Sequence, residues 1–565
     1  MTQQHPWLST YPKHVDWAKH YTGKPLFTLV DDAQRKFPNA VAYSFMGKEI
    51  TYSDLLDQVD RMARGLQGLG IGKGSHVGIF MPNCPQFVVA YFGILKAGGT
   101  VVNYSPLYSV SELIGQVEDS ETDVMITLDL ASLYSTIQDV AHKSRLKHLV
   151  VDKFSHAMPC HKAIMFGLFY NKATTKPVQD EYYVGYKQLL DNDGQYAPVD
   201  IKPETDVAVI QYTGGTTGVP KGAMLTHANL YINVLQTVDW VVDLEFGKEI
   251  VPGFLPFFHV FAMTTVMNLG IYVGAKVVIQ PKFVLEDAIK LMKKIKPSVF
   301  AGVPTMLTAI LNHKDMPNVG LENVKMCLSG GAPLPVELGQ AFKNKLNVSI
   351  SEGYGLTETS PVCSSNPQDR ENRYGSIGLP MPNTEIIIVD REDRTKVIPL
   401  GEKGEICIRG PQVMKGYWKR PEATKEAMLN DMFHTGDVGY MDEEGYTYII
   451  DRDKDLILVG GFNVYPRVVE EAIYEHPAVH EVTVIGIPDD YLGELPKAFV
   501  TLKNPDENLT ENELMAFIKE KLGKHERPKH IEFRAELPRT MIGKLSKKEL
   551  VAEEKAKYEL SKATS

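Results

Sequence analysis

"YTGGTTGVPKGAML", residues 212–225, is the stretch on which the fold and the function of this chain depend. Glycines and threonines precede a single lysine, Lys221, a composition typical of loops that hold phosphate. The usual phosphate loop, G-x-x-x-x-G-K-[ST], is absent, because Lys221 follows a proline and precedes a glycine. The stretch therefore predicts a phosphate-binding loop of another kind. The alternative is a glycine-rich turn without a ligand, since turns use the same residues.

The segments around this loop alternate between strand and helix patterns. Strands are expected at 75–81, 99–105 and 206–212, and helices at 51–70, 85–98 and 227–240. Such alternation predicts a parallel sheet with helices on its faces. We therefore expect the loop at the carboxyl end of a strand, joining it to a helix-bearing segment, where open α/β sheets bind ligands.

Length and composition predict a multidomain globular protein. The 565 residues suggest about three or four packing units. A net charge of −10 argues against nucleic-acid binding, which needs a basic face. The five cysteines are scattered and odd in number, so we expect reduced thiols in a cytoplasmic protein. We expect no targeting signal and no membrane-spanning helix, because no apolar run reaches the roughly 20 residues required.

The pattern changes after residue 450, where segments become shorter and more charged. We expect a large N-terminal α/β domain of layered sheets and helices, residues 1–450, and a smaller mobile α+β domain, residues 451–565.

One apolar run, "AIMFGLFY" at 163–170, is flanked by Lys162, Lys172 and Lys176. Because short apolar runs are usually buried, we expect a helix packed in the core. Contact with a membrane interface is the alternative.

Three further stretches carry residues suited to nucleotide chemistry. In "SEGYGLTETSP", Tyr354 stands between two glycines and could lie against a flat base, while Glu358 could hold Mg²⁺. In "HTGD", Asp437 suits two ribose hydroxyls, although aspartate is also a routine turn residue. In "PRTMIGKLSKKEL", Lys544 lies on a short, mostly apolar loop, although spacing alone favours a surface lysine.

These four stretches, in this order, resemble the adenylate-forming superfamily of acyl-CoA synthetases, luciferases and peptide-synthetase adenylation domains. The resemblance covers nearly the whole chain. Within the superfamily, "EGYGLTE", "GSIGLPMPNTE", "GPQVMKGYW" and "GFNVYP" are most similar to bacterial long-chain fatty acid–CoA ligases. The resemblance implies an enzyme that uses ATP and Mg²⁺ to convert a medium- or long-chain fatty acid to an acyl-adenylate. It then implies acyl transfer to CoA, with AMP and pyrophosphate as the other products.

The resemblance also implies a role for each motif residue. The ATP phosphates would lie on Thr213, Gly214, Gly215, Thr216, Thr217, Gly218 and Lys221. Gly331, Ala332 and Pro333 would border adenine and the acyl carbonyl. Tyr354 would stack on adenine, and Glu352, Gly353 and Gly355 would also bind the nucleotide. Asp437 and Arg452 would bind the ribose, and Lys454 would also contact the nucleotide.

The reacting groups would be handled by fewer residues. Thr357 would contact the α-phosphate, and Glu358, with Thr217, would hold Mg²⁺. Lys544 would bridge the substrate carboxylate and the phosphate. His259 would lie near the acyl carbonyl, although its apolar neighbours also suit a core histidine.

In the family, the C-terminal domain rotates between the two half-reactions. The hinge corresponds to Asp451, and the rotation would bring Gly460, Gly461 and Phe462 to the site for thioester formation. Two departures from the family pattern, Asp453 and the pair Asp431–Met432, lie near this hinge and put CoA affinity in question.

Several alternatives stay open at this stage. The acid could instead be short-chain or aromatic, and a regulator that binds acyl groups or nucleotides without catalysis is the rival from another class. Acyl chain length, a homodimer, loose attachment to the inner face of the cell membrane, and the pathway are all undecided by the sequence.

Overall fold

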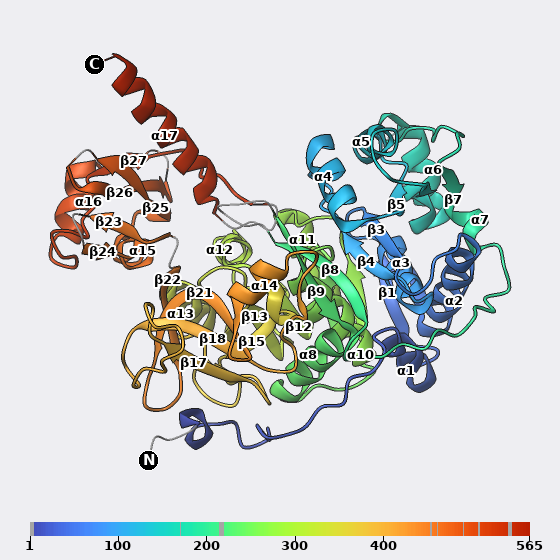
Figure 1. Cartoon of the computed structure of the whole chain (residues 1–565), viewed down its shortest axis with the longest axis horizontal. Coiled ribbons are helices and arrows are strands. Elements are labelled where there is room, and N and C mark those ends of the chain that lie inside the picture. Colours follow the sequence, from blue (N-terminus) through green and yellow to red (C-terminus); the bar gives the residue numbers. More distant parts are fainter. Residues whose placement is uncertain are drawn as a thin grey trace.

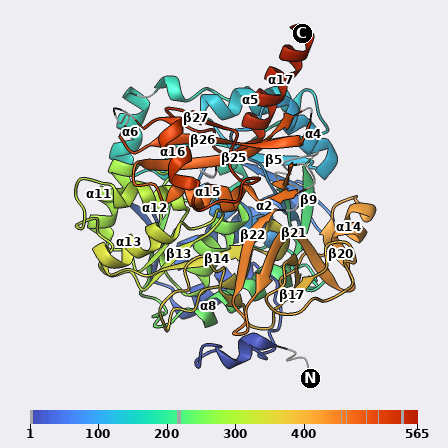
Figure 2. The same ribbon diagram turned by 90° about the vertical axis from the view of Figure 1, so that its left-hand side faces the viewer.

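The structure is a computed structural model. It describes residues 5–169, 171–213, 220–452, 455–459, 462–489, 491–504, 506, 509–540 and 545–564. A large N-terminal region of layered sheets and helices carries a smaller C-terminal domain at one end, from which the last helix projects (Figure 1). That domain faces the viewer when the same end is turned forward (Figure 2). Within the described ranges, no helix is both long and apolar enough to cross a membrane.

The sheet that carries the loop at 213–221 has the strand order β19-β9-β8-β4-β3-β5-β6-β7. Its strands are β3 (His76–Phe80), β4 (Thr100–Asn103), β5 (Val124–Leu128), β6 (His148–Asp152), β7 (Tyr183–Gly185), β8 (Val207–Thr213), β9 (Lys221–Thr226) and β19 (Gly416–Tyr417). The strands from β8 to β7 run parallel, whereas β9 and β19 are antiparallel to their neighbours.

Helices cover both faces of this sheet because its strands are apolar on both sides. One core cluster packs α2 (Tyr52–Gly68) and α3 (Pro85–Lys96) against Val77 and Ile79, and a second packs α4 (Val110–Ser120) and α5 (Ala131–Ala141) against Phe80. Alternate residues of β3 thus point to opposite faces, as the two-residue period of a strand requires.

Two more sheets complete the core of the N-terminal region. One has the order β10-β11-β1-β2, and the other β12-β13-β14-β15-β16. Their strands are β1 (Val41–Phe45), β2 (Lys48–Thr51), β10 (Ile250–Gly253), β11 (Lys276–Ile279), β12 (Val299–Gly302), β13 (Met326–Ser329), β14 (Ile350–Gly355), β15 (Val362–Ser365) and β16 (Leu379–Pro380).

The helical segments of the N-terminal region lie between these strands. Besides α2 to α5 they are η1 (Pro6–Ser9), α1 (Thr28–Lys36), η2 (Phe154–Ala157), α6 (Cys160–Phe169), η3 (Asn171–Ala173), α7 (Tyr186–Leu190), α8 (His227–Trp240), α9 (Val260–Ala262), η4 (Met263–Asn268), α10 (Leu269–Tyr272), α11 (Leu285–Ile295), α12 (Pro304–Leu311), α13 (Val336–Leu346), η5 (Thr357–Thr359) and α14 (Pro421–Ala427).

An antiparallel sheet leads from this region to the C-terminal domain. It contains β17 (Glu385–Val389), β18 (Gly404–Arg409), β20 (Met428–Leu429), β21 (Met432–Met441) and β22 (Thr447–Arg452). The C-terminal domain has its own apolar core, to which the elements that follow contribute, except α17, whose Leu550 packs in a separate small cluster. These are β23 (Ile457–Val459), β24 (Phe462–Val464), α15 (Pro466–Tyr474), β25 (Val479–Asp489), β26 (Gly493–Leu502), α16 (Glu511–Ile518), β27 (His530–Phe533) and α17 (Lys547–Thr564).

The expected fold class is therefore confirmed. Helix α2 starts at a capping box, in which Thr51 accepts a hydrogen bond from the backbone of Asp54 and Asp54 accepts one from that of Thr51. One expectation needs correction, because the loop after β8 does not lead directly into a helix. Residues Lys221–Thr226 form β9, antiparallel to β8, so the loop is the tip of a hairpin and α8 follows later.

The prediction that residues 163–170 form a helix packed in the core is wrong, because the helix lies on the surface. Helix α6 has no buried residue, and Ile164, Met165, Leu168 and Phe169 are 64%, 55%, 69% and 73% exposed. The ring of Phe166 lies on Phe154, with centroids 5.6 Å apart, so one side of the helix touches the core while the other faces solvent. Residue 170 lies outside the described residues.

Candidate functional site

Strands β8 and β9 bring the two ends of the glycine-rich loop together. Thr213 and Lys221 are paired across the hairpin, and the Oγ1 of Thr213 donates to the carbonyl oxygen of Lys221 over 3.4 Å. The ammonium group of Lys221 lies 5.1 Å from the ring centroid of Tyr417. Several predicted site residues lie outside the described residues, namely Gly214, Gly215, Thr216, Thr217, Gly218, Lys454, Gly460, Gly461 and Lys544.

Glu358 is a buried carboxylate next to this hairpin. It lies in the short helix η5 beside the partly exposed Thr357, and it is 9% exposed. Its Oε1 accepts a hydrogen bond of 2.7 Å from the Tyr417 hydroxyl, and its carbonyl oxygen accepts one of 2.7 Å from the backbone of Met414. A buried carboxylate oxygen of this kind suits Mg²⁺, which prefers hard oxygen ligands.

Tyr354 and Asp437 join two stretches that are 83 residues apart. The Tyr354 hydroxyl on β14 donates to the Oδ2 of Asp437 on β21 over 2.5 Å. Burial raises the pKa of Tyr354 well above its usual value, and the negative charge of Asp437 adds to this, so the hydroxyl stays a proton donor. On the other side of Asp437, the backbone of Arg452 is its partner across β21 and β22.

The glycines beside Tyr354 are set by backbone packing. A Cβ at Gly355 would lie 1.8 Å from the carbonyl oxygen of Pro361, and one at Gly353 would lie 2.9 Å from a methyl group of Leu328. Glycine is therefore required at these two positions by the packing of the protein itself, whether or not a ligand binds there.

Glu352 fastens the turn formed by Gly331, Ala332 and Pro333. This turn follows β13, and its next residue, Leu334, donates its backbone N–H to the Oε1 of Glu352 over 3.0 Å. Burial raises the pKa of Glu352 to about 7, against the lowering effect of Arg467. The structure thus gives Glu352 a contact with the protein backbone.

His259 caps the short helix α9. Its Nδ1 accepts from the backbone N–H of Phe261 over 3.3 Å. The neighbouring carbonyl of Phe258 accepts from the side chain of Gln211 on β8 over 3.0 Å, which places this segment beside the strand that enters the loop.

Asp451 is the first residue of the expected C-terminal domain. Its side chain is 7% exposed, and its Oδ2 accepts from the backbone of Arg467 at the start of α15 over 2.8 Å. Arg539 and Leu545, which lie before and after Lys544 in the sequence, form an antiparallel bridge. Phe462 begins β24, opposite Val459.

Sequence reasoning missed Asp119, which joins three segments at the end of α4. Its Oδ2 accepts from the Tyr212 hydroxyl over 2.6 Å, and its Oδ1 from Arg420 over 2.5 Å. Its carbonyl oxygen accepts from the indole of Trp418 over 2.9 Å. Since Tyr212 directly precedes Thr213, this aspartate fixes the entry to the loop.

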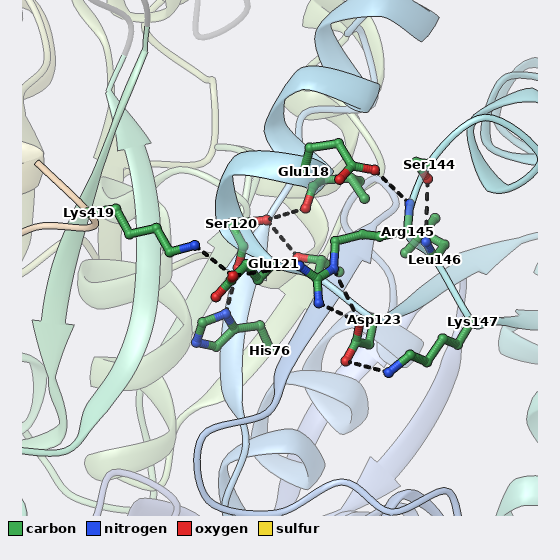
Figure 3. Close-up of polar contacts among 12 residues, drawn as sticks. His76, Glu118, Ser120, Glu121, Asp123, Ser144, Arg145, Leu146, Lys147 and Lys419 are labelled. Atoms are coloured by element: carbon green, nitrogen blue, oxygen red, sulfur yellow. Dashed lines mark hydrogen bonds and ion pairs between the residues drawn. The ribbon is translucent and has the colours of Figure 1, made fainter.

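Further ion pairs brace the same end of α4 (Figure 3). Lys419 pairs with Glu121 at 2.6 Å, and Arg145 and Lys147 pair with Asp123 at 3.1 and 3.2 Å. His76 donates from Nδ1 to the carbonyl oxygen of Ser120. None of these contacts had a local signal in the sequence, because the partners are at least 22 residues apart.

Among the residues the structure describes, Glu405, Cys407 and His434 form the one cluster with mixed metal-ligand chemistry. Among the described residues, the Nε2 of His434 is buried without a hydrogen-bond partner, whereas its Nδ1 and the two oxygens of Glu405 have protein partners. The Nδ1 of His434 lies 2.9 Å from the Oε2 of Glu405, which also accepts from Arg394, while the Oε1 accepts from the backbone of Gly436. Glu405 therefore supports the turn that carries Asp437.

The sequence model of the AMP-binding enzyme family matches residues 30–418, and that of the AMP-binding enzyme C-terminal domain matches residues 468–544. A long-chain-fatty-acid–CoA ligase of Bacillus subtilis (strain 168) is 41% identical over 558 residues, covering 98% of this chain and 99% of the relative. The 4-coumarate–CoA ligase 3 of Oryza sativa subsp. japonica is 31% identical and covers 90% of this chain and 87% of the relative.

Solved structures agree with these relatives. ATP-bound MatB from Rhodopseudomonas palustris superimposes with a TM-score of 0.83 at 28% identity, covering 94% of this chain and 99% of that protein. The anthranilate CoA ligase AuaEII in complex with anthranoyl-AMP gives a TM-score of 0.84 at 26% identity, covering 96% and 100%.

The raised pKa of Glu352 predicts a pH effect on stability. The folded state keeps this carboxyl protonated up to about pH 7, whereas its ordinary pKa is 4.5, so its stabilising effect is lost as the pH rises from 4.5 through 7. The Glu352→Gln variant still accepts the hydrogen bond from Leu334 but does not titrate. We therefore expect the difference in free energy of unfolding between this variant and the parent protein to shift in favour of the variant by roughly 3 kcal/mol from pH 4 to pH 8. Thermal denaturation across this range measures the difference.

Glu337→Gln is the matched control, because Glu337 is exposed at the start of the nearby helix α13. Its melting temperatures should follow those of the parent protein. Parallel pH profiles for Glu352→Gln and the parent protein would contradict the prediction.

Proposed function

The chain belongs to the AMP-binding enzyme family, and from this premise we infer that it is an ATP-dependent ligase that converts a medium- or long-chain fatty acid to its CoA thioester. The observation that carries the proposal is two sets of side-chain contacts near the hairpin. Tyr354 is bonded to Asp437, and Tyr417 contacts both Glu358 and Lys221. These residues come from four separate parts of the sequence, and an aromatic ring, two carboxylates and a cation are what a nucleotide with Mg²⁺ requires.

The chemistry explains why such residues are needed. A fatty carboxylate is anionic and does not acylate a thiol, so it first attacks the α-phosphorus of ATP, and pyrophosphate leaves. Bound Mg²⁺ supplies charge neutralisation at the phosphate oxygens. The thiol of CoA then attacks the acyl carbonyl, and AMP leaves. Two anions meet in the first step, so cationic side chains that face the reacting phosphate lower its barrier.

We assign the chain's own residues to these steps. Thr213 to Lys221 hold the phosphates, Thr357 contacts the α-phosphate, and Glu358 with Thr217 holds the metal. Tyr354 and the turn at Gly331, Ala332 and Pro333 border the base, with Gly353 and Gly355 beside the ring. Asp437, Arg452 and Lys454 hold the ribose side. Glu352 acts by fastening the turn at 331–333, and His259 lies towards the acyl carbonyl.

A fatty acid is favoured as the substrate because relatives that align with 98% of this chain, over 99% of their own length, are long-chain-fatty-acid–CoA ligases. We assign residues 257–267 and 302–311 to the wall of the acyl site, and within the first stretch Met263, Val266 and Met267 are at most 1% exposed. An aromatic acid is the second candidate, since a 4-coumarate ligase is 31% identical.

The proposed function predicts carboxylate-dependent exchange of pyrophosphate into ATP. Among acetate, 4-coumarate, palmitate and oleate, we expect the two long-chain acids to give the highest kcat/KM. Faster exchange with 4-coumarate would show that the acid is aromatic. A folded sample that binds ATP and exchanges with none of the acids would indicate a regulator instead.

We also propose that residues 451–565 rotate about Asp451 between the half-reactions. Lys544→Ala should then slow adenylate formation by at least about 100-fold, because it removes a cation at the reacting phosphate. Supplied with ready-made acyl-adenylate and CoA, the same variant should still form thioester. Gly461→Leu should do the reverse, because a side chain there would narrow the approach of the thiol. Equal loss of both half-reactions in both folded variants would contradict the rotation.

Helix α6 supports a further proposal, loose attachment to the inner face of the cell membrane. Its exposed apolar residues are followed by the exposed Lys172 and Lys176, and the exposed Lys162 lies in its first turn, where it donates to the carbonyl of Met46 over 2.7 Å. Apolar side chains with adjacent cations suit an anionic lipid surface.

Sedimentation with phosphatidylglycerol vesicles tests this attachment. Binding should fall when the salt concentration rises, because surface charge attraction is screened. Replacing Ile164, Leu168 and Phe169 by serine should abolish it and leave ATP binding intact. The control replaces Leu107 and Leu560, which are 71% and 68% exposed elsewhere. If the triple serine variant of α6 pellets with the vesicles as much as the control variant does, α6 has no role in membrane attachment.

A further inference from the structure

We propose that Tyr417 is a positioning residue with two separable tasks: its hydroxyl orients Glu358 towards the metal, and its ring orients Lys221 towards the phosphates. This proposal rests on the proposed function. Nothing in the sequence marked Tyr417, which stands in "GPQVMKGYW" at a distance of 59 residues from Glu358.

The hydroxyl task follows from the hydrogen bond to Glu358. Tyr417 and Glu358 are 8% and 9% exposed, and the donor–acceptor distance is 2.7 Å. Burial and the nearby charge of Glu358 raise the pKa of Tyr417, so its hydroxyl keeps its proton and donates. A charge-assisted bond in a buried setting fixes the rotation of the carboxylate.

The ring task follows from the contact with Lys221. The side chain of Lys221 is exposed, and among described residues the ring of Tyr417 is the aromatic face that lies under its ammonium group. A cation over an aromatic face is attracted by the ring quadrupole, which limits the positions that a long side chain samples. Lys221 is therefore held beside Glu358 before any nucleotide arrives.

The backbone of Tyr417 is fixed from both sides. It pairs with Ala223 on β9, and the next residue, Trp418, donates to the carbonyl of Gly222 over 2.7 Å. The N–H of Tyr417 donates to the Oγ1 of Thr424 over 2.9 Å. A side chain on so rigid a backbone can position its partners.

The same segment is also bonded to the strand that enters the loop. Trp418 and Arg420 both donate to Asp119, which accepts in turn from the Tyr212 hydroxyl. Residues 414–420 therefore contact η5, β9 and, through Asp119, β8. Tyr417 lies in the middle of this segment, where the expected metal ligand and the expected phosphate-binding lysine meet.

Nucleotide binding without acid separates the two tasks, because no reaction occurs. Isothermal titration with ATP is carried out with Mg²⁺ and with EDTA. Tyr417→Phe keeps the ring and loses the hydroxyl, so affinity for MgATP should fall about tenfold while affinity for metal-free ATP stays unchanged. Tyr417→Leu loses the ring and the hydroxyl, so the affinity for ATP should fall both with Mg²⁺ and with EDTA.

Tyr21→Phe is the matched control. Its hydroxyl donates to the Oδ2 of Asp239, also over 2.7 Å, and its ring is buried in a separate cluster against α8. It should bind ATP like the parent protein under both conditions. If Tyr417→Leu does not fold, fluorinated phenylalanines at position 417 test the ring at nearly constant volume, and affinity for metal-free ATP should fall with increasing fluorination.

The outcomes distinguish this proposal from the proposed function. If the parent protein binds no ATP, the proposed function itself is wrong, and Tyr417 loses its role with it. If the parent protein binds and exchanges pyrophosphate, but Tyr417→Phe weakens ATP binding equally with and without Mg²⁺, Tyr417 is a packing residue and the proposal is overturned. An unchanged Mg²⁺ dependence in Tyr417→Phe also overturns it.

Discussion

The hydrogen bond from Tyr354 to Asp437 is the interaction on which the arrangement of the site depends. It joins β14 in the core of the N-terminal region to β21 in the sheet that leads to the C-terminal domain. The next strand, β22, ends at Arg452, opposite Asp437 and one residue after Asp451. The same bond therefore sets the direction of the Tyr354 ring and anchors the strand from which the C-terminal domain departs. Charge-assisted bonds of this kind are strong and directional, which suits a junction between two sheets.

A second constraint is the burial of charge beside the β8–β9 hairpin. Glu358 is almost enclosed, and a buried carboxylate is costly unless hydrogen bonds compensate for lost water. The Tyr417 hydroxyl provides such a bond. The carboxylate of Asp119 on α4 likewise accepts hydrogen bonds from Tyr212 and Arg420. The two strands of the hairpin are thus flanked by carboxylates that accept hydrogen bonds from neighbouring segments.

The sequence predicted what local signals determine. Thr51 and Asp54 form the capping box that starts α2, and β3, α3 and β4 lie where apolar periodicity placed them. It did not predict β9, because six residues after a proline carry too little periodicity to separate a strand from a loop. It could not tell which way α6 faces, since an all-apolar run has no polar side to orient it. Tyr417, Asp119 and Glu405 escaped because their partners are distant in sequence, and only the folded chain brings them together.

An ion pair inside the C-terminal domain links its last helix to α15. Burial alone would lower the pKa of Lys547, but the negative charges of Glu470, Asp451 and Asp455 outweigh this effect and raise it. Lys547 forms an ion pair with Glu470 at 3.2 Å. Lys547 begins α17, directly after the segment that carries Lys544, and Glu470 lies on α15. A bridge between Arg539 and Leu545 pairs the described residues on either side of that segment. Because these contacts lie within residues 451–565, the rotation proposed about Asp451 would carry the Lys544 loop without breaking them. The cost of the rotation would then fall on contacts between the domains, such as the approach of Arg467 to the buried Glu352.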